Sequence, residues 1–139
     1  MQTTKTSPNA ARIEVVVEVP RFGFIKRDTA GRIDVVSPLP CPFNYGSVPG
    51  TLAGDGDPVD AVILGPWRAQ GAQFSSYLRG TVDFIDAGEE DPKLIVSDRP
   101  LSAWDRWQVT NFFRTYAVFK RGLNRARGRK GPTAFRGWR

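Results

Sequence analysis

The feature that most constrains the fold is a series of short β-type segments with no helical pattern between them. Residues 13–20 read IEVVVEVP, where one face is apolar, the other includes two glutamates, and β-branched residues dominate, which predicts a strand. Glycine and proline separate further predicted strands at 22–26, 32–36, 61–64, 75–85 and 93–96. Because no helical stretch of about 10–15 residues intervenes, the pattern disfavours a parallel βαβ sheet and favours a small antiparallel barrel.

One helix is expected after these strands. Ser102 can cap its start, and Asp105 three positions later completes a capping box. Apolar and aromatic residues then recur at helical spacing, namely Val109, Phe112, Phe113, Tyr116 and Phe119. The sequence therefore predicts a mainly β fold with flanking α structure.

Length and charge define the expected domain organisation. With 139 residues and 40% hydrophobic content, the chain is long enough for one domain with its own core. We expect a disordered N-terminus at 1–11, the domain at 12–123 and a basic C-terminal tail at 124–139, with the last ten residues poorly ordered. All 14 acidic residues lie in residues 1–105, whereas residues 106–139 hold 10 of the 20 Lys and Arg residues.

Composition also excludes several kinds of chemistry and location. The chain has no histidine, so the commonest general base and zinc ligand are missing. No run approaches the roughly 18 apolar residues of a membrane span, and the N-terminus lacks the apolar stretch of a secretory signal. The single cysteine, Cys41, agrees with a reducing compartment. We expect a soluble cytoplasmic protein with no membrane partner.

The stretch GDGDPVDAV at 54–62 places Asp55, Asp57 and Asp60 directly before an apolar strand. Like charges this close repel each other unless a cation neutralises them. Counting from Asp55, an EF-hand would need Gly and Glu where Asp60 and Pro66 stand, so that calcium loop is excluded. Carboxylates on a tight turn suit Mg²⁺, although a solvated acidic turn is the other interpretation of this stretch alone.

A second acidic stretch, DAGEEDPKL, contains Asp86, Asp91 and Lys93. Together with GDGDPVD it resembles the soluble family I inorganic pyrophosphatases, which have a D-G-D-P-x-D loop followed by a similar acidic segment. Further motifs match in the same order. Each of these motifs puts a residue at a position that the family pattern uses: Glu18 in VEVP, Lys26 and Asp28 in FIKRD, Tyr45 in PFNYG, and Tyr116 in NFFRTY.

The resemblance implies a fold and a reaction. The fold would be an OB-like five-stranded antiparallel β-barrel with a C-terminal helix, and the reaction Mg²⁺-dependent hydrolysis of pyrophosphate to two phosphates, with Mn²⁺ as another possible ion. A homo-oligomer is implied as well. The metal ligands would be Asp55, Asp60, Asp86, Asp91 and, through water, Glu18.

By the same resemblance, Asp60 would approach two metal ions, and Asp86 with Asp91 would hold a third that arrives with substrate. Asp57 would be the general base beside the attacking water. The substrate ligands would be Lys26, Tyr45, Lys93 and Tyr116. Lysine and tyrosine are suitable donors to phosphate, and a pair of metal ions can activate water and neutralise substrate charge.

The chain departs from the family pattern on the substrate side. A family arginine falls on Ser37 or in a shortened segment, a tyrosine on Cys41, and a lysine on Ala117. Lys120, on the same helix face as Tyr116, is a candidate replacement for the lysine, and Arg27 or Arg32 for the arginine.

Two alternatives follow from these departures and from the basic C-terminus. The chain could hydrolyse a different phosphoanhydride, or be an inactive homologue. It could instead be an OB-like nucleic-acid-binding module that uses the basic residues of its tail. The net negative charge of residues 1–105 argues against the nucleic-acid alternative, because a phosphate backbone would be repelled there.

Overall fold

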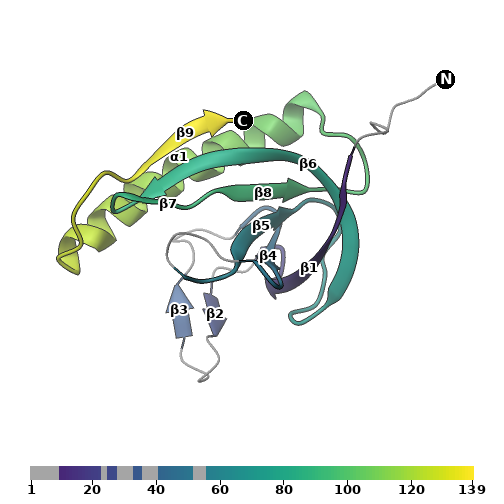
Figure 1. Ribbon diagram of the computed structural model, residues 1–139, viewed down its shortest axis with the longest axis horizontal. Coiled ribbons are helices and arrows are strands. Elements are labelled where there is room, and N and C mark those ends of the chain that lie inside the picture. The colour runs from purple at the N-terminus through teal and green to yellow at the C-terminus, as the bar shows by residue number, and fades with distance from the viewer. Residues whose placement is uncertain (1–9, 23–24, 28–32, 36–40, 52–55) are drawn as a thin grey trace.

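The computed structural model describes residues 10–22, 25–27, 33–35, 41–51 and 56–139. Figure 1 shows a curved sheet with one long helix along its side. The elements in chain order are β1 (Arg12–Val19), β2 (Ile25–Arg27), β3 (Ile33–Val35), β4 (Asn44–Val48), β5 (Val59–Ile63), β6 (Gln73–Asp86), β7 (Glu89–Glu90), β8 (Lys93–Val96), α1 (Ala103–Ala126) and β9 (Ala134–Trp138).

Five strands form a closed ring in the order β1, β4, β5, β8 and β6, and β6 pairs again with β1. This confirms the expected mainly β fold with a C-terminal helix. The pairing of β5 with β8 is parallel, so the expectation of a wholly antiparallel set was wrong at this place. The long strand β6 lies between β5 and β8 in the sequence and is antiparallel to β8. The chain therefore reverses before β8, which can then run in the same direction as β5.

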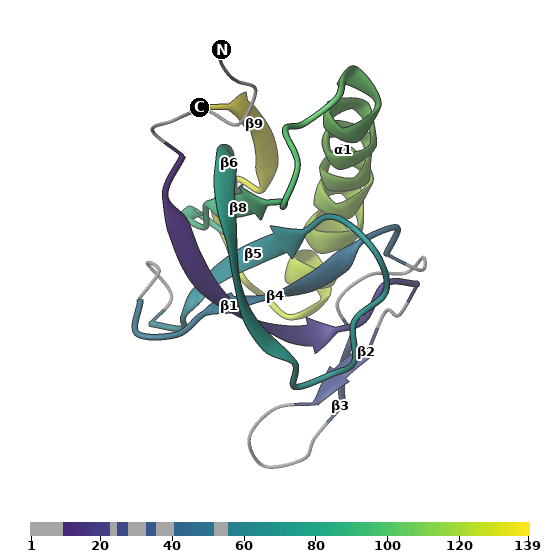
Figure 2. The ribbon, with the colours of Figure 1, turned by 90° about the vertical axis from the view of Figure 1, so that its right-hand side faces the viewer.

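The long strand β6 connects most of the sheet. Its first part pairs with β1, its middle with β8, and its last part with β9 and the short strand β7. The strand curves across the molecule in both views (Figures 1 and 2). Its C-terminal end carries Asp86, so the curvature determines where that residue lies relative to β8 and α1.

Two apolar clusters hold the strands and the helix together. Along β5, Val62 packs in the cluster that includes Val109 and Phe113 of α1, whereas Ala61 and Ile63 pack in a second cluster formed with other strands. The strand is therefore buried on both faces, which explains its uninterrupted apolar sequence. Burying one such side chain completely stabilises the fold by about 1.5–3 kcal/mol.

The helix α1 begins as the sequence predicts. Ser102 is its N-cap, the backbone N–H of Asp105 donates to the Ser102 hydroxyl, and the Asp105 carboxylate accepts from the backbone N–H of Ser102. Arg99 also donates to Asp105. These bonds, chiefly that from Arg99, outweigh burial and lower the pKa of Asp105. Among the described residues, no helix is both long and apolar enough to cross a membrane.

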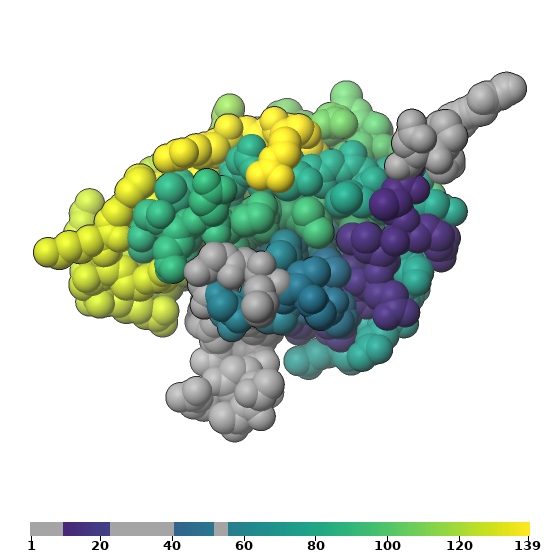
Figure 3. Space-filling view, viewed as in Figure 1, coloured from purple at the N-terminus to yellow at the C-terminus, as the bar shows by residue number. Residues whose placement is uncertain are grey.

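The C-terminal residues are ordered, which corrects the expectation for the last ten. They include β9, which pairs with β6, and Trp138 Nε1 donates to Thr110 Oγ1 of α1 at 2.9 Å. Phe135 and Trp138 pack against the main core. Figure 3 shows the end of the chain lying along the body of the molecule. These aromatic contacts fix a segment that was predicted to be a tail because it is rich in arginine and glycine. Of the first eleven residues, 1–9 lie outside the described part.

Candidate active site

The centre of the site is a buried lysine between two aspartates. The register of β5 and β8 places Asp60 opposite Lys93. Lys93 Nζ donates to Asp60 Oδ2 at 2.6 Å and to Asp91 Oδ2 at 2.8 Å, and only 1% of the lysine side chain is exposed. Tyr45 donates its hydroxyl to Asp60 Oδ2 at 2.9 Å. We call Tyr45, Asp60, Asp91 and Lys93 the Lys93 cluster.

Aromatic rings enclose the ammonium of the Lys93 cluster. Nζ lies 5.8 Å from the ring centroid of Tyr45, 5.6 Å from that of Phe84 and 6.0 Å from that of Tyr116. Burial alone would lower the pKa of Lys93, but the charge of Asp60 and then the other neighbours outweigh it and raise that pKa well above its usual value. Burial and the charge of Asp60 raise the pKa of Tyr45. Lys93 therefore stays charged, and Tyr45 stays a neutral donor.

A second cluster surrounds Asp86 at the end of β6. Asn124 Nδ2 donates to Asp86 Oδ1 at 2.7 Å, while Lys120 Nζ lies 3.3 Å and Arg129 Nη1 3.5 Å from Asp86 Oδ2. Burial opposes ionisation, but the Asn124 hydrogen bond and the two cations lower the pKa of Asp86. Asp86, Lys120, Asn124, Arg129 and Thr133 are called the Asp86 cluster below.

The helix and the segment after it position the Asp86 cluster. Tyr116, Lys120 and Asn124 are four residues apart on α1, so they share one face of the helix. Asn124 Nδ2 also donates to Thr133 Oγ1 at 3.0 Å, and the backbone N–H of Ala87 donates to the same hydroxyl at 2.9 Å. Thr133 therefore links the helix to the turn that follows Asp86.

This turn and the C-terminal segment approach each other closely. The backbone N–H of Gly88 donates to the carbonyl of Pro132 at 2.9 Å. Gly131 has φ +102°, and a Cβ there would stand 2.7 Å from the carbonyl carbon of Ala87. Only glycine fits both the backbone conformation and the contact. The segment that sequence analysis assigned to a tail thus supports a candidate site residue.

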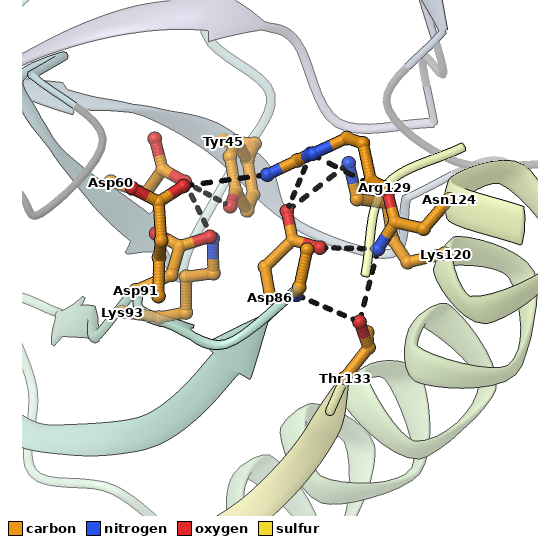
Figure 4. Close-up of polar contacts among 11 residues, drawn as sticks. Tyr45, Asp60, Asp86, Asp91, Lys93, Lys120, Asn124, Arg129 and Thr133 are labelled. Carbon is orange, nitrogen blue, oxygen red and sulfur yellow. Dashed lines mark hydrogen bonds and ion pairs between the residues drawn. The ribbon is translucent and has the colours of Figure 1, made fainter. Parts of the chain in front are cut away.

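The two clusters lie side by side, as Figure 4 shows. Tyr116 borders both clusters, because its ring centroid is 6.0 Å from Lys93 Nζ and Lys120 follows it by one turn of α1. Burial is the main cause of its raised pKa. The backbone N–H of Asp91 donates to the carbonyl of Phe84 at 2.9 Å, which ties the residue after β7 back to β6. Six of the candidate residues from the sequence are thereby brought into one region: Tyr45, Asp60, Asp86, Asp91, Lys93 and Tyr116.

The structure describes only some of the remaining candidate residues. Glu18 Oε2 accepts a hydrogen bond from Ser47 Oγ at 2.8 Å, and Ser47 is opposite Asp60 in the pairing of β4 with β5. Asp57 is exposed in the turn before β5. The following lie outside the described residues: Asp55, Asp28, Arg32 and Ser37, together with the side chains of Lys26 and Arg27.

Sequence reasoning missed Asn124, Arg129 and Thr133. The spacing of Asn124, eight residues after Tyr116 on the same helix face, is a signal for that residue. Arg129 and Thr133 follow the helix, and they meet Asp86 and Ala87, respectively, only through tertiary structure, across more than 40 residues of sequence. No local pattern identifies such a contact.

The residues of the Lys93 cluster fit a hard divalent cation chemically. Asp60 and Asp91 direct carboxylate oxygens toward one positive group, and carboxylates are the ligands such ions prefer. Within the described residues, no three metal-binding side chains lie together. The resemblance requires Asp55 as the third ligand, and this residue lies outside the described part.

The chain is similar to known proteins over most of its length. A family model described as inorganic pyrophosphatase matches residues 15–132. The chain is 28% identical over 147 residues to an inorganic pyrophosphatase of Synechocystis sp., covering 91% of this chain and 87% of the relative. It is 32% identical over 126 residues to one of Halalkalibacterium halodurans, covering 75% of this chain and 76% of the relative.

A solved structure shows the same fold. The inorganic pyrophosphatase of Thermus thermophilus matches with a TM-score of 0.72 and 23% identity, covering 100% of this chain and 87% of that chain. These matches define a class of enzymes that hydrolyse a phosphoanhydride. The chain belongs to the inorganic pyrophosphatase family. Members of this family need a divalent metal ion, and neither alternative function is favoured.

Proposed function

We propose that this chain hydrolyses inorganic pyrophosphate to two phosphates with Mg²⁺ as the usual ion. The observation that supports this most strongly is the Lys93 cluster, in which two family-position aspartates and a buried lysine meet within hydrogen-bonding distance. Phosphoryl transfer depends mainly on positioning and charge stabilisation, which this arrangement supplies. When bound, divalent ions would lower the pKa of a water molecule and neutralise charge on the substrate.

The residues of the Lys93 cluster have distinct proposed roles. Lys93 holds Asp60 and Asp91 in fixed positions for the metal ion. An ammonium has three donor protons, so one remains for a phosphate oxygen beside the two that Asp60 and Asp91 accept. Burial raises the pKa of Tyr45 and of Tyr116, so both stay neutral. Tyr116 is a proposed donor to phosphate, and the single O–H of Tyr45, which Asp60 accepts, would turn to phosphate when substrate binds. Lys26 is a further proposed ligand, and Glu18 is proposed to act on a metal ion through water.

Asp57 is the proposed general base. Its exposed place before β5 gives a water molecule access to its carboxylate, and its family position is beside the attacking water. Asp55, Asp60, Asp86 and Asp91 are the direct metal ligands that the resemblance implies. For Asp86, the contacts in this chain support a different role, which is taken up below.

The test is phosphate release from pyrophosphate with and without Mg²⁺. The native chain should release phosphate only with the metal, and Asp57→Asn should lower the rate by about 10²–10⁴-fold, the usual contribution of a general base. Glu14→Gln, a change at an exposed carboxylate of β1, is the matched control and should leave the rate unchanged. No release by the native chain would contradict the proposal, and other phosphoanhydrides would then be assayed.

Three further properties belong to the same proposal. Mn²⁺ should substitute for Mg²⁺, since both accept carboxylate oxygen ligands. The enzyme is proposed to form a homo-oligomer and to work in the cytoplasm, in agreement with its single buried cysteine. Sedimentation of the purified chain tests the assembly, and a monomer at all concentrations would contradict it.

A further inference from the structure

Asp86 is surrounded by positive charge supplied by the protein itself. Its Oδ1 accepts from Asn124, and its Oδ2 is 3.3 Å from Lys120 Nζ and 3.5 Å from Arg129 Nη1. Only 13% of the Asp86 side chain and 15% of the Lys120 side chain are exposed, so water screens these interactions incompletely. Both oxygens of this carboxylate therefore have close partners (Figure 4).

Arg129 has contacts that hold it in place independently of Asp86. Arg129 Nη1 donates to Asn124 Oδ1 at 3.4 Å, and the backbone N–H of Arg129 donates to the Asn124 carbonyl at 2.8 Å. Arg129 Nη2 donates to Glu89 Oε1 at 3.5 Å. Lys120 belongs to α1, one turn beyond Tyr116. A divalent ion at Asp86 would have to displace these two cations or stand beside them, and like charges at that distance repel strongly.

The sequence around the Asp86 cluster agrees with a change of role. Ala117 stands where the resemblance implies a lysine after Tyr116, so a positive charge is missing there. Lys120 and Arg129 supply two positive charges on the same side of the site. Lys120 is one turn beyond Tyr116 on α1, and the Tyr116 ring centroid is 6.0 Å from Lys93 Nζ.

We propose that in this chain Lys120 and Arg129 form a built-in cation pair that takes the place of a metal ion at Asp86. Asp86 is then an anchor for the pair, and the pair holds substrate phosphate on this side of the site. This inference rests on the proposed pyrophosphate hydrolysis. It predicts that the substrate complex contains one metal ion fewer than a complex in which Asp86 is a ligand.

The experiment counts metal ions directly. Mn²⁺ binding is measured by equilibrium dialysis with saturating methylenediphosphonate, a non-hydrolysable pyrophosphate analogue, for the native chain, Asp86→Asn and Asp91→Asn. Asp86→Asn should bind as many ions as the native chain, whereas Asp91→Asn should bind at least one fewer. Asp86→Asn keeps the size and an oxygen acceptor, and its circular dichroism spectrum should match that of the native chain.

A double variant tests the cation pair itself. Lys120→Met with Arg129→Met should bind the analogue at least about tenfold more weakly at fixed Mn²⁺, since charged hydrogen bonds are lost. The double variant should also bind one more ion than the native chain. A triple variant that adds Asp86→Asn should lose that extra ion. The control is Arg125→Met with Lys130→Met, two exposed basic residues of the same segment, which should change neither quantity.

The possible results separate this inference from the proposed function. If the native chain hydrolyses pyrophosphate and Asp86→Asn loses one bound ion, the inference is wrong and the proposed function stands. If the double variant binds the same number of ions and the analogue with native affinity, the inference is wrong as well. If the native chain releases no phosphate from pyrophosphate, the proposed function fails first.

Discussion

The Lys93 cluster and the Asp86 cluster are neighbours with opposite arrangements of charge. In the first, two carboxylates, Asp60 and Asp91, converge on one ammonium. In the second, two cations, Lys120 and Arg129, converge on one carboxylate. Asp86 and Asp91 are five residues apart in the sequence. The groups that the fold brings to an aspartate therefore decide, more than the local motif does, whether its surroundings attract a metal ion or an anion.

The cations of the two clusters differ in burial, although the carboxylates do not. The side chain of Lys93 is 1% exposed, whereas those of Lys120 and Arg129 are 15% and 37% exposed. Breaking a buried ion pair leaves an uncompensated charge without water, while a pair at the surface contributes little. Substitutions in the Lys93 cluster should therefore have larger effects on stability than those in the Asp86 cluster.

The largest effect is expected for Lys93→Met. Removing the ammonium leaves Asp60 and Asp91 facing each other, and breaking a buried pair costs about 3–5 kcal/mol. Urea unfolding in the presence of a chelator measures the free energy of unfolding. Lys130→Met, at an exposed lysine, is the control. A loss below about 1 kcal/mol, as for a surface pair, would remove the distinction between the clusters.

A smaller effect is expected for Asn124→Leu. The change keeps the approximate size of a buried side chain but removes its donors to Asp86 and Thr133, which should cost about 1–3 kcal/mol. The same unfolding measurement applies, with Asn111→Leu at a half-buried position of α1 as the matched control. Equal losses in the two variants would show that the Asn124 contacts add nothing.

The smallest effect concerns pH. The pKa of Asp86 is lowered from its ordinary value of 3.8 because Asn124, Lys120 and Arg129 outweigh the effect of burial. Its ionised form therefore stabilises the fold above pH 3.8, and this contribution is lost as the pH falls through the lowered pKa. Asp86→Asn should lose less thermal stability than the native chain between about pH 5 and pH 2. Parallel curves for the two proteins would contradict the assignment of charge in this cluster.

Local sequence patterns correctly predicted the elements that are determined by interactions within a few residues. The strand at 93–96 has the predicted bounds, and Ser102 with Asp105 forms the predicted capping box. Such elements depend on alternation or on hydrogen bonds within a few residues, which one segment of sequence contains. The family motifs likewise identified the residues that meet in the Lys93 cluster.

The strand β4 was not predicted because its buried residues are partly polar. Asn44 is fully buried, and its Oδ1 accepts from the backbone N–H groups of Arg21 and Arg68 at 3.0 Å each. Gly46 lies so close to β1 that a Cβ would stand 1.8 Å from the carbonyl oxygen of Val16. A polar residue and a glycine in a strand lower its apparent β-propensity, although tertiary contacts require both.

The Asp86 cluster shows the same limit in the site. Sequence reasoning placed Lys120 on the correct helix face, yet Arg129 and Thr133 were assigned to a tail because their segment is rich in arginine and glycine. Their contacts arise because β9 pairs with the far end of β6 and brings residues 129–133 to the turn after Asp86. A long-range strand pairing of this kind has no local signature.

The most direct test of the contrast between the clusters is the Mg²⁺ dependence of pyrophosphate hydrolysis in Asp91→Asn and Asp86→Asn, measured in parallel. Asp91→Asn should raise the Mg²⁺ concentration for half-maximal rate at least about tenfold, since even residues behind a metal ligand change affinity by that factor. Asp86→Asn should leave that concentration unchanged and raise the KM for pyrophosphate. An equal shift in the Mg²⁺ requirement of both variants would contradict the account, because Asp86 would then act as a metal ligand like Asp91.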